Sequence, residues 1–130
     1  MIVLDASAAL EWLLQTSVGQ QIEKRLYARS ESLHTPHLMD LEVAQVLRRL
    51  VREKIVSASR ASEAAQDLEA LRVTRYPHFV MLTRIWQLRE NLSAYDAAYV
   101  VLAEKLGAAL VTRDVRLAAA SGHQAKVEVF

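Results

Sequence analysis

Met1-Ile-Val-Leu-Asp5 opens the chain and indicates its fold class. Ile2–Leu4 is a short apolar run, typical of a strand buried on both faces. Residues 6–14 follow with the pattern of a helix, so strand and helix meet at Asp5 without a loop. In an open α/β sheet, the residue at such a junction lies in the crevice at the carboxyl ends of the strands, where ligands bind. Asp5 is therefore a candidate site residue.

Two more aspartates occupy equivalent positions. Asp96 stands in Ser93-Ala-Tyr-Asp96-Ala-Ala-Tyr, at an expected helix start, and Asp114 follows the apolar segment Ala-Ala-Leu-Val-Thr-Arg113. Two carboxylates about 4 Å apart repel each other by about 4 kcal/mol at an effective dielectric constant of about 20. If Asp5, Asp96 and Asp114 converge, they need raised pKa values or a bound cation. A hard divalent cation, Mg²⁺ or Mn²⁺, prefers such oxygen ligands and can activate water.

Each acid also has a purely structural explanation. Ser93 and Asp96 form a Ser-x-x-Asp capping box, and Asp114 could simply cap the short helix that follows it. Glu42 lies on the polar border of its helix, and Asp40 lies nearer to the apolar arc. Periodicity therefore does not choose between Glu42 and Asp40 as a fourth acid.

Strand and helix patterns alternate along the chain. The predicted strands cover residues 2–4, 32–35, 73–76, 108–112 and 126–129, and the predicted helices cover 6–14, 17–29, 36–56, 59–71 (or from 62), 79–92, 93–105 and 115–120. This alternation predicts an α/β fold of three layers, α/β/α, with a parallel sheet of about five strands. Without a linker or repeat, one domain of residues 1–130 accounts for the chain.

Two local expectations follow from the pattern. Pro36 suits the first turn of a helix whose N-cap is Thr35. In the predicted helix 79–92, the periodicity places Leu82, Ile85 and Trp86 on the inward face.

Composition excludes several classes of protein. The absence of cysteine rules out disulfides, thiolate catalysis and zinc–thiolate sites, and a net charge of +1 does not indicate a nucleic-acid binder. The apolar runs are too short for a membrane span, and the N-terminus lacks a signal-peptide pattern, so we expect a cytoplasmic location. With three glycines, the chain has no Gly-rich phosphate loop. His34 and His37 are separated by Pro36, and we interpret them as incidental rather than as a ligand pair.

The sequence resembles the PIN-domain nucleases, specifically the VapC-type toxins of bacterial and archaeal toxin–antitoxin pairs. The resemblance rests on four segments in matching order, Met1-Ile-Val-Leu-Asp5-Ala-Ser7, Pro36-His-Leu-Met-Asp-Leu-Glu42, Ser93-Ala-Tyr-Asp-Ala-Ala-Tyr-Val-Val-Leu-Ala-Glu-Lys-Leu-Gly107 and Leu110-Val-Thr-Arg-Asp-Val-Arg-Leu117. Together they cover essentially the whole chain.

The resemblance implies a site that periodicity could not supply. It selects Glu42 rather than Asp40, and it implies that Ser7 and Thr112 lie beside the carboxylates and orient them or a water. The metal site it implies contains four acids, Asp5, Glu42, Asp96 and Asp114, with Asp5 and Asp96 as direct ligands. Many relatives carry another acid or amide shortly after the position of Asp114, whereas this chain has Val115, Arg116 and Leu117. One or two metal ions both remain open.

The expected function is that of a Mg²⁺- or Mn²⁺-dependent endoribonuclease, the toxin of a type II pair, with RNA as substrate and a cognate antitoxin as partner. The alternatives are a housekeeping or DNA-directed PIN nuclease and a catalytically silent PIN binding module. Arg49, Arg113 and Arg116 are candidates to bind the RNA backbone.

Two surfaces are expected to bind protein partners. Trp12, Leu13 and Leu14 would expose apolar surface to an amphipathic helix of the antitoxin. A homodimer is also expected, with spare apolar surface on the helices that hold Leu82, Ile85, Trp86, Tyr95 and Tyr99.

Overall fold

The computed structural model describes all 130 residues and contains one five-stranded sheet in which every neighbouring pair of strands is parallel. Its order is β3-β2-β1-β4-β5. The strands are β1 (Ile2–Leu4), β2 (Leu33–Pro36), β3 (Val73–Tyr76), β4 (Ala109–Thr112) and β5 (Lys126–Val129). β1 is central and fully buried, and Ile2 lies opposite Leu33 of β2 and Ala109 of β4.

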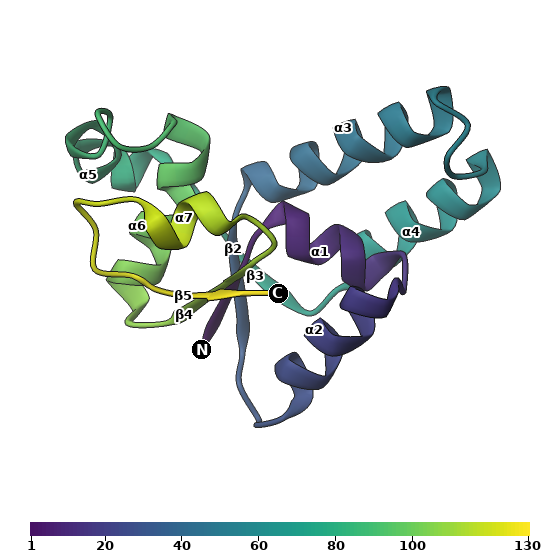
Figure 1. Cartoon of the computed structure of the whole chain (residues 1–130), viewed down its shortest axis with the longest axis horizontal. Helices are drawn as coiled ribbons and strands as arrows, with labels where there is room; N and C mark the ends of the chain where they lie inside the picture. Colours follow the sequence, from purple (N-terminus) through teal and green to yellow (C-terminus); the bar gives the residue numbers. More distant parts are fainter.

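Helices cover the sheet. They are α1 (Ala6–Leu13), α2 (Ser17–Tyr27), α3 (Leu38–Arg52), α4 (Ala58–Ala70), the 3₁₀ helix η1 (Phe79–Met81), α5 (Leu82–Gln87), α6 (Ala94–Leu106) and α7 (Val115–Ala119). α6 contacts β1, β2 and β4, and α1 contacts β4. Figure 1 shows α1 to α4 on one side of β1 and β2, with α5 and α6 on the other. The predicted α/β fold with a parallel five-stranded sheet between helices is confirmed.

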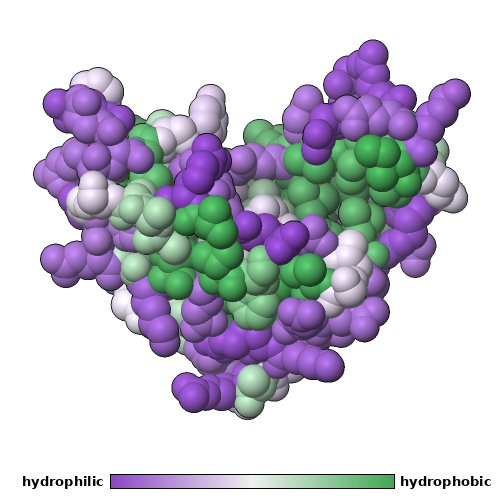
Figure 2. All heavy atoms as spheres, in the orientation of Figure 1, coloured by the Kyte–Doolittle hydropathy of each residue, from purple (hydrophilic) through white to green (hydrophobic).

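The outline of the molecule places the site. The α3–α4 pair and the α5 region project as two arms, and a notch separates them (Figures 1 and 2). α1 and α3 begin near the base of this notch, where β1 and β2 end. The carboxyl edge of the sheet therefore opens into a hollow between the arms.

Local signals set several helix ends. Ser93 caps α6 by accepting the backbone N–H of Asp96 at 3.1 Å, and Gly107 ends α6 in the left-handed conformation with φ of +60°. Ser57 caps α4 in the same way, through the N–H of Arg60. α6 is buried along its whole middle, from Ala97 to Ala103, which makes it a rigid support for residues at its start.

Two local expectations were wrong. α3 begins at Leu38 after His37, which has no side-chain capping bond, because Pro36 is still the last residue of β2 and pairs with Tyr76. Residues 79–92 do not form one helix but divide into η1, α5 and turns.

The second error also changes which side chains face inward. Met81, Ile85 and Leu88 are the buried residues of this segment, whereas Leu82 is 53% exposed and Trp86 67% exposed. Met81, Ile85 and Leu88 are spaced by four and three residues and so share the face that packs on the core. Leu82 and Trp86 each follow one of these residues and therefore point to the surface.

The core is a single cluster of 31 buried hydrophobic residues centred on β1, β4 and α6. None of the helices has the length and apolar character that crossing a membrane requires.

Candidate active site

Asp5 lies at the end of β1, where it also caps α1. Its Oδ1 accepts the backbone N–H of Ala8 at 2.9 Å and the hydroxyl of Ser7 at 2.7 Å. Its Oδ2 accepts the hydroxyl of Thr112, the last residue of the neighbouring strand β4. The side chain is almost fully buried, so every donor that holds it belongs to the protein.

Ser7 and Thr112 connect Asp5 to the β4–α7 turn. Ser7 Oγ accepts the N–H of Arg113 at 2.9 Å while its own proton points to Asp5. Thr112 Oγ1 accepts the N–H of Asp114 at 2.9 Å and donates to the other Asp5 oxygen. Each hydroxyl is therefore oriented by a backbone N–H, and the pair fixes the plane of the Asp5 carboxylate.

Glu42 lies on the second turn of α3, half-buried and facing α6. Its Oε1 accepts the hydroxyl of Tyr99 at 2.6 Å. Asp40, the alternative acid, turns toward β3 and pairs with Arg75 at 2.7 Å. Glu42 therefore faces α6, the helix that carries Asp96, whereas Asp40 is paired with β3.

The charges of Asp5, Glu42 and Asp96 act on one another. Burial raises the pKa of Asp5, and repulsion by Asp96 adds to the increase, against three hydrogen bonds that lower it. Burial likewise raises the pKa of Glu42, the hydrogen bond from Tyr99 opposes this, and repulsion by Asp96 and Asp5 adds to it. Asp96 itself is half-buried in the first turn of α6. Acids from β1, α3 and α6 therefore share one electrostatic environment.

Asp114 lies at the same edge of the sheet but has its own counter-charge. It caps α7 by accepting the N–H of Arg116 at 2.9 Å, and the Arg116 guanidinium binds both its oxygens, with Nη2–Oδ2 at 2.6 Å. The hydrogen bond from the Arg116 side chain lowers the pKa of Asp114. Asp5, Glu42 and Asp96 are therefore near enough for their charges to repel one another, whereas Asp114 is paired with Arg116.

As they stand, no three acidic or histidine side chains are close enough together to hold a metal ion. The donor set nevertheless fits a hard divalent cation, because it consists only of carboxylate oxygens with neighbouring hydroxyls. Two of its acids have raised pKa values that a positive charge would relieve. His34 takes no part, since its ring nitrogens bond to Ser32 and Tyr76.

A hollow of about 440 Å³ runs from the site between α1 and α3. Ser7 and Glu42 of the site line it, together with the charged residues Glu11, Arg49 and Arg113. Its apolar lining comes from both helices, namely Ala6, Leu10, Leu14, Val46 and Leu50. The groove therefore combines apolar and charged side chains.

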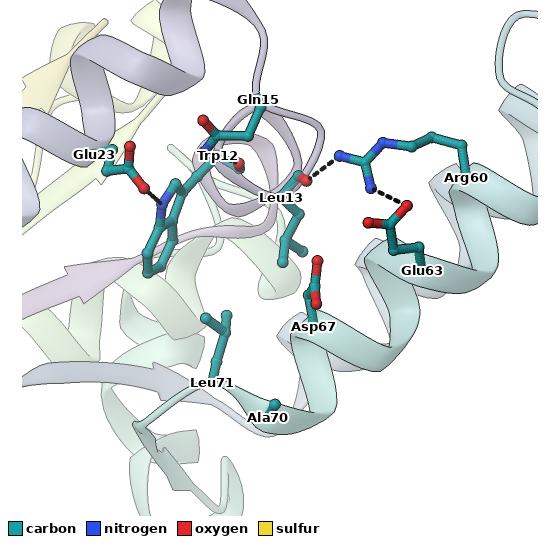
Figure 3. A pocket seen from close by; sticks show the side chains of 9 residues that line it. All are labelled: Trp12, Leu13, Gln15, Glu23, Arg60, Glu63, Asp67, Ala70 and Leu71. Carbon is teal, nitrogen blue, oxygen red and sulfur yellow. Dashed lines mark hydrogen bonds and ion pairs between the residues drawn. The ribbon is translucent and has the colours of Figure 1, made fainter.

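The expectation that Trp12 and Leu13 are exposed was wrong, because both are less than 8% exposed. They form the floor of a different hollow, of about 400 Å³, between α1, α2 and α4 (Figure 3). There Trp12 Nε1 donates to Glu23 at 3.1 Å, and Arg60 donates to the Leu13 carbonyl at 2.7 Å. This hollow contains none of the three coupled acids.

Comparison with known proteins identifies the family. The model of the PIN domain matches residues 2–122. The chain belongs to the PIN-domain family. Ribonuclease VapC9 of Mycobacterium tuberculosis is 46% identical over 129 residues, which cover 99% of this chain and 98% of that relative. The resemblance to VapC-type PIN proteins is thus confirmed.

Solved structures agree with this fold. PAE2754 from Pyrobaculum aerophilum superposes on this VapC-family chain with a TM-score of 0.72 and 27% identity, covering 98% of this chain and 83% of that one. The structure of VapBC2 from Rickettsia felis bound to a DNA fragment from its promoter contains a chain that superposes with a TM-score of 0.68 at 12% identity. The superposition covers 99% of this chain and 98% of that one. The second likeness is one of fold alone.

Reasoning from the sequence missed one residue of the site. Tyr99 was assigned to a possible dimer surface, but it is buried against Glu42. The available signal was its position three residues after Asp96, which places both side chains on one face of α6.

Proposed function

We propose that this VapC-family protein hydrolyses RNA with the help of Mg²⁺ or Mn²⁺ at the crevice of Asp5, Glu42 and Asp96. The chain is a toxin-type endoribonuclease of the VapC group, and the metal and the site residues are our proposal. The observation that carries it is that burial raises the pKa values of Asp5 and Glu42 at this edge of the sheet, and that repulsion among Asp5, Glu42 and Asp96 adds to both increases. Burying carboxylates in this way costs free energy of folding, and such groups with shifted pKa values cluster at functional sites.

The residues of the proposed site are either metal ligands or residues that orient those ligands. Asp5 and Asp96 are the proposed direct ligands, and Glu42 completes the site directly or through water. Ser7 and Thr112 hold the Asp5 carboxylate in one plane. Asp114 becomes available when Arg116 releases it, and the backbone N–H of Asp114 keeps Thr112 oriented in either case.

A bound Mg²⁺ or Mn²⁺ would lower the pKa of a water for attack on phosphorus and offset the charge on the phosphoryl oxygens. The protein's own contribution is to hold the carboxylates of Asp5 and Glu42 in fixed orientations through Ser7, Thr112 and Tyr99. Arg49, Arg113 and Arg116 stand around the same crevice and are proposed to bind the RNA backbone.

A cognate antitoxin is the proposed partner, and the groove between α1 and α3 is its proposed binding surface. Leu10, Leu14, Val46 and Leu50 suit the apolar face of a partner helix. Because Glu42 lines the same groove, an arginine or lysine of the same partner segment could reach the acids and take the place of the cation. We also propose that the protein acts in the cytoplasm, where its RNA substrate and its antitoxin are made.

The test of the activity is cleavage of structured RNA by the purified protein. Cutting should require Mg²⁺ or Mn²⁺ and stop with EDTA. Asp96→Asn should lose activity by roughly 100-fold or more, because a metal ligand loses its charge, while its N–H keeps the bond to Ser93 and the helix start is retained. Full activity in Asp96→Asn would exclude Asp96 as a ligand.

The test of the toxin role is expression in the native host. The wild-type chain should arrest growth, Asp5→Ala should not, and co-expression of a neighbouring small open reading frame should restore growth. Soluble, metal-loaded protein that leaves unprotected cells unharmed would contradict the toxin role while leaving the ribonuclease assay valid.

A further inference from the structure

Glu42 has one polar partner in the structure, and that partner is Tyr99. The Tyr99 hydroxyl donates to Glu42 Oε1 at 2.6 Å, and Glu42 makes no other hydrogen bond and no ion pair. Asp5, by contrast, is held by three donors. The orientation of the α3 acid therefore depends on a single contact.

The position of the Tyr99 hydroxyl is fixed by its ring. The ring is 3% exposed and packs in the middle of the buried stretch of α6. The hydroxyl is therefore presented to Glu42 from a fixed ring.

The contact joins two of the three elements that supply the acids. Tyr99 belongs to α6, one turn after Asp96, and it donates to Glu42 on α3. Glu42 is repelled by Asp5 and Asp96, and it lines an open groove into which its side chain could turn. A donor fixed on α6 opposes that movement.

We infer that Tyr99 is a positioning residue that holds Glu42 in the crevice beside Asp5 and Asp96. Its burial keeps it from the substrate, so it acts through Glu42 and not on the reacting atoms. This inference rests on the proposed function insofar as Glu42 serves the metal site. The alternative is that Tyr99 is an ordinary core tyrosine whose hydroxyl merely finds an acceptor.

Tyr99→Phe separates these possibilities because it removes the hydroxyl and keeps the ring. The first readout needs neither metal nor RNA. Side-chain NMR couplings of Glu42 in the metal-free protein should report one χ1 rotamer in the wild type and averaged rotamers in Tyr99→Phe. A single, unchanged rotamer in the variant would overturn the inference, whatever the enzyme assay shows.

The second readout is a double-mutant cycle with Glu42→Gln, measured by Mn²⁺ affinity and by RNA cleavage. Tyr99→Phe alone should weaken Mn²⁺ binding and lower kcat by about tenfold with little change in KM for RNA, the size expected for one charge-assisted hydrogen bond. In the Glu42→Gln background it should have no further effect. Equal losses in both backgrounds would show that Tyr99 does not act through Glu42, and the inference would fail.

Tyr76→Phe is the matched control. It removes another tyrosine hydroxyl, bonded to His34 at 2.7 Å on β2 and β3, away from the three acids. It should leave the Glu42 rotamer, Mn²⁺ affinity and cleavage unchanged, and thermal unfolding should confirm that both variants fold. A wild-type protein that neither binds Mn²⁺ nor cuts RNA would contradict the proposed function, whereas the NMR comparison would still decide the role of Tyr99.

Discussion

Asp5 serves two purposes with one carboxylate. It starts α1 by accepting the N–H of Ala8, and the same buried group belongs to the acid crevice. Its raised pKa means that the ionised form is less favourable in the folded protein than in the unfolded chain. Without a cation, Asp5 therefore holds its proton more tightly in the folded protein than in the unfolded chain. The ionised form of Asp5 lowers the free energy of unfolding.

Asp5→Asn tests that statement. Asparagine keeps the shape and can still cap the helix, so the metal-free variant should unfold a few degrees above the metal-free wild type at neutral pH. The difference in melting temperature should shrink as the pH falls below the raised pKa of Asp5 in the folded protein. It should vanish below the ordinary pKa of 3.8, where Asp5 is protonated in both the folded and the unfolded state. Mg²⁺ should then stabilise the wild type and not the variant. Thermal unfolding monitored by circular dichroism measures these melting temperatures with and without Mg²⁺. Equal melting temperatures of the metal-free variant and wild type at neutral pH would contradict the destabilising role of the ionised Asp5.

Arg116 is the other residue whose role depends on charge. Its side chain is 78% exposed, so its pair with Asp114 should contribute little to stability. If Arg116 binds RNA phosphate, Arg116→Gln should leave the melting temperature nearly unchanged and weaken binding to catalytically inactive protein. The slope of log affinity against log salt should decrease by about 0.7 for single-stranded RNA. An unchanged slope would remove Arg116 from the RNA contacts.

At the scale of elements, α6 is the helix on which the site depends. It carries Asp96 in its first turn and Tyr99 in its second, and burial on all sides from Ala97 to Ala103 keeps it in one position. Its start is set by Ser93, whose hydroxyl accepts the N–H of Asp96 itself. The hydrogen bond that caps α6 therefore also fixes the backbone of Asp96, a proposed metal ligand.

Ser93→Ala should show both effects. Loss of the cap should reduce the free energy of unfolding by about 1 kcal/mol, and fraying of the first turn should lower cleavage because Asp96 loses its fixed position. Ser57→Ala is the control, since it removes the equivalent capping bond at the start of α4. It should cost similar stability, measured by urea unfolding, and leave cleavage unchanged. A similar loss of activity in both variants would attribute the effect to general destabilisation.

At the scale of the whole molecule, apolar side chains remain exposed around α5. Phe79, Val80, Leu82, Trp86 and Tyr95 are each more than half exposed, and they come from η1, α5 and the start of α6, which contact one another. Ile85 and Tyr99, also considered for a dimer surface, are buried in the core instead. A self-complementary surface of this kind suits a two-fold dimer, which we still predict.

Trp86→Asp tests the dimer. The side chain is exposed, so the change should leave the fold intact but place a charge in the dimer contact, giving a species of 14.6 kDa in sedimentation at micromolar concentration. Ile55→Asp, at another exposed apolar position, should behave as the wild type. A wild-type protein that sediments as a monomer under these conditions would count against the homodimer.

Local patterns in the sequence determined much of this protein. The apolar runs of β1 and β4, the Ser93 cap and the Gly107 end of α6 depend on residues within a few positions, and short-range sterics and hydrogen bonding act at that distance. Only the tertiary structure decided which acids meet. The order β3-β2-β1-β4-β5 brings α1, α3 and α6 together, so Glu42 reaches the crevice while Asp40 pairs with Arg75. Packing likewise turned Trp86 outward and Tyr99 inward, because the partners of both lie far away in the chain, where no local pattern can specify them.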